Sequence, residues 1–284
     1  MKRKAGKELF KLLCAGFFLG ASVQASPGAA YFLFSNTNLI TLNTWNPLPN
    51  TAPYPSSINV AGLAGLVVTR ATVTLQGLTH QSPSDVALLL VGPQNQRALL
   101  MAEVGGQDAR YSNVTNLTLI FDDNATQTLP VFSNLTSGTF KPTDGWLDPY
   151  FGDPGGVLPY DFPFPAPLGS SNSVSALSVF QNADPTGTWN LFALDDSSVY
   201  SGYISNGWEL SLSVAVPLQI TQSLTNVVVS WPASVTNCQL QSSPAFLGAN
   251  TWSNVVTTPV SIADRVYVTN SISGEGALYR LVTN

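Results

Sequence analysis

The stretch Asp184-Pro185-Thr186-Gly187-Thr188-Trp189-Asn190-Leu191, followed by Asp195-Asp196 and then by Gly207-Trp208-Glu209-Leu210, carries the clearest structural signal of this chain. It reads as a turn, a strand, an acidic loop and a second strand. In the second strand Trp208, Leu210, Leu212 and Val214 alternate with polar residues, and a period of two is typical of a half-buried antiparallel strand. The sequence therefore predicts an all-β protein with acidic loops between its strands.

The first 25 residues are typical of a secretory signal peptide. They begin with five basic residues, at positions 2, 3, 4, 7 and 11, and continue with an apolar run from Leu12 to Val23. The run is short for a membrane span, and Val23-Gln24-Ala25 has the small-x-small pattern of a cleavage site. We expect cleavage after Ala25 and a mature protein that is secreted or held at the cell surface, without a transmembrane segment.

Removal of residues 1–25 makes the chain strongly acidic. The remainder has 6 basic and 15 acidic residues, a net charge of −9, and 12 of its acids are aspartate. Such a surface repels nucleic acid, so we expect no nucleic-acid partner. Cys238 is the one cysteine left after cleavage, so no intrachain disulfide can form. Stability must then come from the core, from bound cations, or from both.

Alternating and continuous apolar runs predict the strands of one large β-sandwich over residues 26–216, whose first part, 26–60, would wrap the sandwich edge. The expected strands are Thr69–Leu78, Val86–Val91, Arg97–Met101, Leu117–Phe121, Ala176–Phe180, Thr188–Leu194 and Tyr203–Val216. Residues 141–169 form a long loop rich in proline, glycine and aromatic residues, and connections of this length are often functional. Short strands follow Pro217, and they suit a small fibronectin-like or immunoglobulin-like module over 217–284.

Seven motifs, and their order along the chain, are similar to those of a known family. They are Ser84 to Pro93, Phe121-Asp122-Asp123, Gly138 to Pro142, Leu177 to Phe180, Asp184 to Leu191, Asp195-Asp196 and Gly207 to Leu210. Over residues 60–216 the chain resembles the P domain (P/Homo B) of proprotein convertases and bacterial subtilisin-like proteases, as a stand-alone bacterial copy. Residues 217–284 resemble the small β modules that end secreted proteins of Verrucomicrobia-like bacteria.

The resemblance implies a galactose-binding-like, jelly-roll-like antiparallel β-sandwich that stabilises a neighbouring protease domain and often binds calcium. Two departures from the family pattern affect positions that would supply ligands to this calcium. Ala87 occupies a position where the family often has Asp, and Tyr200 stands where a further Asp commonly precedes Ser201-Gly202. The resemblance also suggests an accessory role for a subtilisin-like protease encoded elsewhere.

The residues themselves argue against an enzyme. A Ser-His-Asp site needs an imidazole base, and the only histidine of the sequence, His80, lies where a surface or strand-end histidine is the ordinary explanation. One histidine and one mature cysteine make a zinc or copper site improbable. A glycosidase needs two suitably spaced carboxylates, whereas Glu103 and Glu209 look isolated in the sequence. We therefore expect no catalytic residues.

Calcium is the cofactor that the sequence favours. Six aspartates lie at strand ends or in turns, where loops of one sandwich edge can converge, namely Asp85, Asp122, Asp123, Asp184, Asp195 and Asp196. Calcium takes six to eight hard oxygen ligands in flexible geometry. Turn capping by the same side chains is the alternative, because aspartate readily accepts hydrogen bonds from nearby backbone amides.

A role in binding stays open beside the structural or adhesive role that we expect. The long loop contains Trp146, Tyr150, Phe151, Tyr160 and Phe162, which could stack on sugar rings or could close the open end of the sandwich. A carbohydrate-binding module is thus the alternative function, and the partner could be a glycan, a protein or a cell surface.

Overall fold

The computed structural model describes residues 31–43, 51–106, 112–145, 162–169, 173–196, 199–223, 225–236, 238–244, 252–271 and 277–283. The expected signal peptide, residues 1–25, lies outside this described part. Contacts along the chain divide it into two compact units, Gly28–Ala215 and a second that contains Val216–Asn284. Within the described ranges, no helix combines the length and the apolar composition that a membrane crossing requires.

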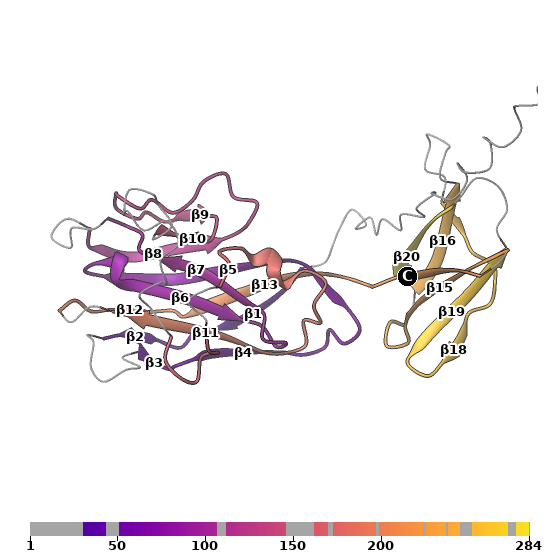
Figure 1. The fold of residues 1–284 in the computed structure, drawn as a ribbon, viewed down its shortest axis with the longest axis horizontal. Helices are drawn as coiled ribbons and strands as arrows, with labels where there is room; N and C mark the ends of the chain where they lie inside the picture. The colour runs from indigo at the N-terminus through magenta and orange to yellow at the C-terminus, as the bar shows by residue number, and fades with distance from the viewer. Residues whose placement is uncertain are drawn as a thin grey trace, which may run out of the picture. The chain divides into compact units, whose positions relative to one another are not determined.

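The first unit is a sandwich of two β-sheets, which confirms the all-β fold class (Figure 1). One sheet contains β1 (Tyr31–Asn36), β2 (Ile40–Leu42), β3 (Thr51–Ala52), β5 (Val67–His80), β8 (Val114–Phe121), β9 (Gly138–Phe140), β12 (Gly202–Ile204) and β13 (Trp208–Ala215). The other has the order β10-β7-β6-β11-β4, formed by β4 (Ser56–Val60), β6 (Val86–Val91), β7 (Arg97–Ala102), β10 (Thr143–Asp144) and β11 (Gly187–Asp195). Most pairs are antiparallel, while β9 with β8 and β10 with β7 are parallel.

The alternation of apolar and polar residues along the strands determines which side chains form the core between the two sheets. On β13, Trp208, Leu210 and Leu212 are buried, while the residues between them are half-buried, as the period of two predicts. Trp189 of β11 fills the core from the opposite sheet, and its indole N–H donates to the Pro185 carbonyl oxygen at 2.9 Å. Trp208 donates to the Ser56 hydroxyl at 3.0 Å, so both large indoles are buried with their polar atoms satisfied.

The second sheet is covered on its outer face as well, which explains the unbroken apolar sequence of β6. Ala87, Leu89 and Val91 face outward and pack with Phe192 and Leu194 of β11. Phe162 and Ala166, from the far end of the long loop, lie on this layer and are buried by it. A strand buried on both faces needs apolar residues at every position.

Two sequence predictions of secondary structure are wrong. Leu177–Phe180 forms a 3₁₀ helix, η5, in place of a strand. The Asp123 carboxylate accepts the backbone N–H groups of Leu177 and Ser178, at 2.8 and 2.7 Å, and this caps the helical turn. The segment from Tyr203 to Val216 forms two strands, β12 and β13, because a turn interrupts it at Gly207, which has a φ of 63° and no room for a side chain against Asn36.

The second unit is also a β-sandwich of two sheets. Its strands are β14 (Gln219–Ser223), β15 (Asn226–Pro232), β16 (Cys238–Pro244), β17 (Ser253–Asn254), β18 (Val260–Ile262), β19 (Arg265–Ser271) and β20 (Ala277–Thr283). The sheet orders are β14-β15-β19-β18 and β17-β16-β20. Trp231 and Val229 lie at the centre of its core.

Candidate metal centre

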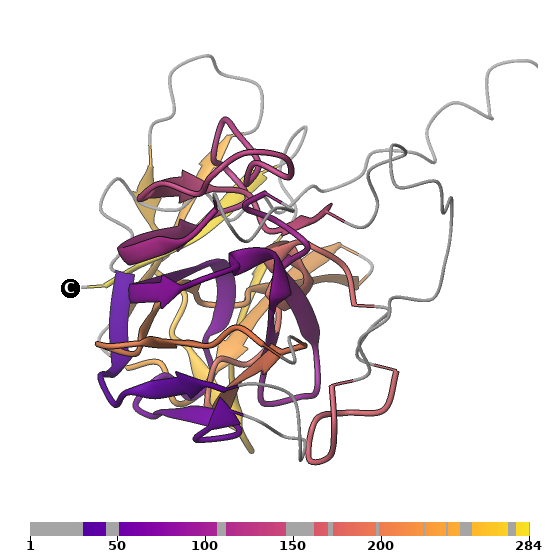
Figure 2. The same cartoon turned by 90° about the vertical axis from the view of Figure 1, so that its left-hand side faces the viewer.

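Three of the six predicted aspartates meet at one end of the first unit. Asp85 lies directly before β6, and Asp195 ends β11, which runs antiparallel to β6 with Asp195 opposite Val86. The backbone N–H of Asp196 donates to the carbonyl oxygen of Asp85 at 3.0 Å, which closes this end of the strand pair. The carboxylate oxygens of Asp85, Asp195 and Asp196 consequently lie within 4.8 Å of one another. This end carries β12, β2 and β3 in Figure 1 and faces the viewer in Figure 2.

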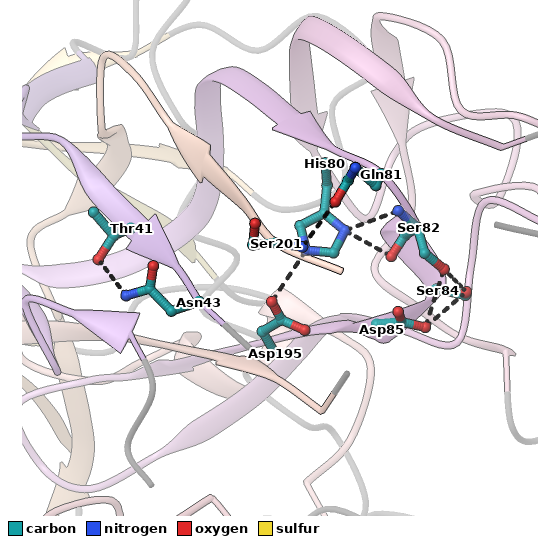
Figure 3. A network of polar contacts seen from close by, with 9 residues as sticks. All are labelled: Thr41, Asn43, His80, Gln81, Ser82, Ser84, Asp85, Asp195 and Ser201. Atoms are coloured by element: carbon teal, nitrogen blue, oxygen red, sulfur yellow. Dashed lines mark hydrogen bonds and ion pairs between the residues drawn. The ribbon is translucent and has the colours of Figure 1, made fainter. Parts of the chain in front are cut away.

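Local hydrogen bonds fix the Asp85 side chain. Pro83–Asp85 forms one short 3₁₀ turn, η1, in which the Asp85 N–H donates to the Ser82 carbonyl oxygen at 3.0 Å. The hydroxyl groups of Ser82 and Ser84 donate to Oδ1 of Asp85 at 3.0 and 3.3 Å. Figure 3 shows the two serines and the carboxylate as one polar group. Two hydroxyl groups thus hold the Asp85 carboxylate in place.

His80 holds Asp195 from the opposite sheet. His80 is the last residue of β5, and its Nε2 lies 3.1 Å from Oδ2 of Asp195, with both side chains fully buried (Figure 3). Its Nδ1 lies 2.7 Å from the Ser82 carbonyl oxygen and 3.1 Å from the Ser82 backbone nitrogen. Gly202 of β12 packs against the ring, where a Cβ would lie 2.4 Å from Cδ2 of His80. His80 is a strand-end residue, as expected, but it is buried rather than exposed.

Two further acids belong to the same end. Glu103 follows β7, which is antiparallel to β6 and therefore ends where β6 begins. Asp144 ends β10, where it lies opposite Ala102 of β7. Glu103 is close enough to Asp196, Asp85 and Asp144 for each of their charges to raise its pKa. The sequence-based view that Glu103 is isolated is therefore wrong. We refer to Asp85, Glu103, Asp144, Asp195 and Asp196 as the acidic cluster.

The carboxylates of the acidic cluster repel one another, and the pKa values of Glu103 and Asp196 reflect this repulsion together with burial. Burial, followed by repulsion from Asp196, Asp85 and Asp144, raises the pKa of Glu103 from 4.5 to about 7. Burial, followed by repulsion from Asp85 and Asp195, raises the pKa of Asp196 from 3.8 to about 7, although its own backbone hydrogen bond and His80 act in the opposite direction. At neutral pH, protons or a bound cation must offset this repulsion.

The remaining three predicted aspartates lie at the opposite end of the strands and contact other partners. Asp122 forms an ion pair with Arg70 of β5 and accepts the Asn124 N–H at 3.0 Å. Asp123 caps η5, and Asp184 accepts the Thr186 N–H at 2.8 Å in a turn. Arg70 and His80 are about 30 Å apart along β5, at ~3.3 Å per residue. The structure thus separates the six residues into two groups of three.

Of the other residues that the sequence singled out, the structure describes Phe162, Ala87 and Tyr200. Trp146, Tyr150, Phe151 and Tyr160 lie outside the described residues. Phe162 is buried on the outer face of the second sheet, where it acts as a packing residue. Ala87 points into the same apolar layer, and Tyr200 is half-buried in the segment between β11 and β12.

Sequence reasoning missed Glu103, Asp144 and the pairing of His80 with Asp195. The signal was available for Glu103, since a residue that follows one strand of a hairpin lies beside the residue that precedes the other. His80 gave no such signal, because its partner is 115 residues away on the other sheet.

Comparisons with known proteins leave the family open. No protein-family model matches the chain, and no curated protein matches it. The crystal structure of a serine protease of Aeromonas sobria is 13% identical, with a TM-score of 0.29, over 68% of this chain and 28% of that one. The structure of Aeromonas sobria serine protease with its chaperone is 14% identical, with a TM-score of 0.30, over 64% of this chain and 26% of that one. The chain thus spans about a quarter of the length of these structures, and scores this low assign neither family nor function.

Proposed function

We propose that this chain is a non-catalytic, exported β-sandwich protein of the P/Homo B type, and that its acidic cluster binds calcium as a structural ion. The observation that carries the proposal is the approach of the carboxylates of Asp85, Asp195 and Asp196 to within 4.8 Å of one another, beside Glu103, whose pKa is raised by burial and then by Asp196, Asp85 and Asp144. A divalent cation at this point would offset the repulsion and tie the ends of β6, β7 and β11 together.

The donor set favours calcium over other metals. The acidic cluster offers carboxylate oxygens, whereas zinc and copper sites usually contain histidine or cysteine. The one histidine at this end, His80, already contacts Asp195 and Ser82 through its two ring nitrogens. Calcium accepts an irregular set of oxygens at 2.3–2.6 Å, while magnesium requires nearly ideal octahedral geometry. Asp85, Asp195 and Asp196 would supply the carboxylate ligands, and Asp85 and Asp196 are half-buried.

The geometry around His80 supports a non-catalytic role. A serine-type hydrolase needs a hydroxyl oxygen at the free nitrogen of an accessible imidazole. Here the ring is fully buried, Nε2 faces Asp195 and Nδ1 faces the Ser82 backbone. The resemblance of the seven sequence motifs to P domains supports a stabilising role, at the cell surface or outside the cell, next to a protein partner.

The test is thermal unfolding of residues 26–284 in calcium and in excess EDTA. Binding to the folded state at a hundredfold excess over Kd adds about 2.7 kcal/mol, so the midpoint should rise by several degrees. Asp85→Asn and Asp196→Asn should abolish the rise. Asp184→Asn is the matched control, since it removes the same charge at the other end and should leave the rise intact. An equal midpoint in calcium and EDTA for the unchanged protein would refute the proposal.

A further inference from the structure

A pocket of about 470 Å³ opens on the outer face of the second sheet, at the end opposite the acidic cluster. Its floor is formed by three outward-facing residues of β11, namely Thr188, Asn190 and Phe192. Phe162 and Ala166 pack on the same face with Phe192 and Leu194, and Pro165 and Pro167 of this segment also line the pocket. The volume lies within the range of roughly 300–1,000 Å³ that small-molecule sites occupy.

Among the described residues that line the pocket, none has a charged side chain. Its polar groups are the amides of Gln94, Asn95 and Asn190 and the hydroxyls of threonine, while proline, valine and Phe192 supply apolar contacts. An anion or a metal ion finds no complementary charge here, and a fatty ligand would leave the amides and hydroxyls unpaired. A neutral, polyhydroxylated ligand with apolar C–H faces fits both parts of the lining.

Two polar side chains of the floor keep free hydrogen-bonding capacity. Asn190 accepts a hydrogen bond from the Ser57 hydroxyl through Oδ1 at 2.6 Å, which leaves its NH₂ group without an acceptor among the described residues. Thr188 is exposed, and its hydroxyl has no partner in the described part of the chain. A donor fixed by its own hydrogen bond, beside a hydroxyl that both donates and accepts, is a suitable pair for a vicinal diol.

The rim of the pocket is held in one shape. Gln94 donates to the Asp184 carbonyl oxygen at 3.0 Å and accepts from Gln96 at 2.9 Å, which joins the turn after β6 to the turn before β11. Gly187 passes so close to Pro93 that a Cβ there would lie 2.8 Å from Cβ of Pro93. Asp184, predicted as a metal ligand, fixes the second turn through the Thr186 N–H. A fixed rim lowers the entropy cost of binding.

We propose that this pocket binds a neutral sugar residue, with Asn190 and Thr188 on its hydroxyl groups and Pro165 and Pro167 against its C–H face. The site is independent of the acidic cluster. Trp146, Tyr150 and Tyr160, which the sequence suggested for the same ligand class, lie outside the described residues.

Saturation-transfer NMR with glucose, galactose, mannose and N-acetylglucosamine tests the proposal on residues 26–284, in EDTA and in calcium. At least one sugar should bind, with equal affinity in both buffers. Asn190→Asp keeps the acceptor for Ser57 but removes the donor, and Thr188→Val removes one hydroxyl. Each should weaken binding about threefold to tenfold, the loss of one neutral hydrogen bond. Thr115→Val, an exposed threonine of β8, and Asp85→Asn are the controls and should bind as the unchanged protein does.

Three results would overturn the proposal. The first is that none of the four sugars binds. The second is that a sugar binds equally well to the unchanged protein, to Asn190→Asp and to Thr188→Val. The third is that Trp146→Ala abolishes binding while the two pocket variants retain it, which would place the sugar at the long loop. Thermal unfolding of each variant shows whether it is folded, so a loss of binding can be assigned to the pocket.

Discussion

His80 and Asp195 form a fully buried pair across the two sheets, with Nε2 of the histidine 3.1 Å from Oδ2 of the aspartate. The aspartate comes from the end of β11 and the histidine from the end of β5, so the pair joins the sheets where the acidic cluster lies. Asp195 therefore has a positively polarised partner of its own. Burial first, and then repulsion among the neighbouring carboxylates, raises the pKa values of Glu103 and Asp196.

Removal of His80 should destabilise the first unit strongly. His80→Ala removes the imidazole that faces the buried Asp195 carboxylate, and breaking a buried pair in this way costs about 3–5 kcal/mol. Urea unfolding measures the loss. The double variant His80→Ala/Asp195→Ala should lose less than the sum of the two single variants, because the charge is then gone as well. Strictly additive losses would mean that the two side chains do not interact.

Stability without calcium should fall as the pH rises through neutrality. The pKa values of Glu103 and Asp196 are about 7 in the folded protein, against ordinary values of 4.5 and 3.8. The folded state therefore binds more protons than the unfolded state between these limits. The favourable contribution is complete below about pH 4 and is lost as the pH passes 7.

Thermal unfolding in EDTA between pH 5 and pH 8 measures this effect, and Glu103→Gln is the matched variant. The variant has no charge to repel at position 103, so it should gain stability relative to the unchanged protein as the pH rises. Calcium should reduce the difference at pH 8. Parallel pH profiles for the two proteins would show that Glu103 is not strained by its neighbours.

Asp123 should matter for folding and not for calcium. Its two carboxylate oxygens accept the N–H groups of Leu177 and Ser178 at the start of η5. Loss of such a cap costs about 0.5–2 kcal/mol, so Asp123→Ala should lower the free energy of unfolding by this amount. The midpoint shift between calcium and EDTA should persist. A lost shift would place Asp123 among the calcium ligands and contradict the separation of the two ends.

The sequence predicted the fold class and much of the strand set because the residues of each strand carry their own signal. Val86–Val91 is apolar throughout and became β6 with both ends as predicted, and the alternation from Trp208 matches the burial of β13. The metal prediction grouped six aspartates without asking which way each strand runs. Asp85 precedes β6 and Asp195 ends the antiparallel β11, so they meet, whereas Asp184 precedes β11 and lies at the other end. The sequence alone could therefore have predicted which of the aspartates lie at the same end. The pairing of His80 with Asp195 could not have been predicted in this way, because it depends on how the two sheets stack.

A last prediction concerns Thr186, whose hydroxyl is buried without a hydrogen-bond partner among the described residues. A buried unsatisfied polar group costs about 1–3 kcal/mol. Thr186→Val replaces the hydroxyl with a methyl group of similar size and keeps the backbone N–H that donates to Asp184. The variant should therefore unfold at a higher urea concentration than the unchanged protein. Thr188→Val, two residues further on and exposed, should leave the urea midpoint nearly unchanged. A lower midpoint for Thr186→Val would mean that the hydroxyl bonds to a water molecule whose loss outweighs the gain.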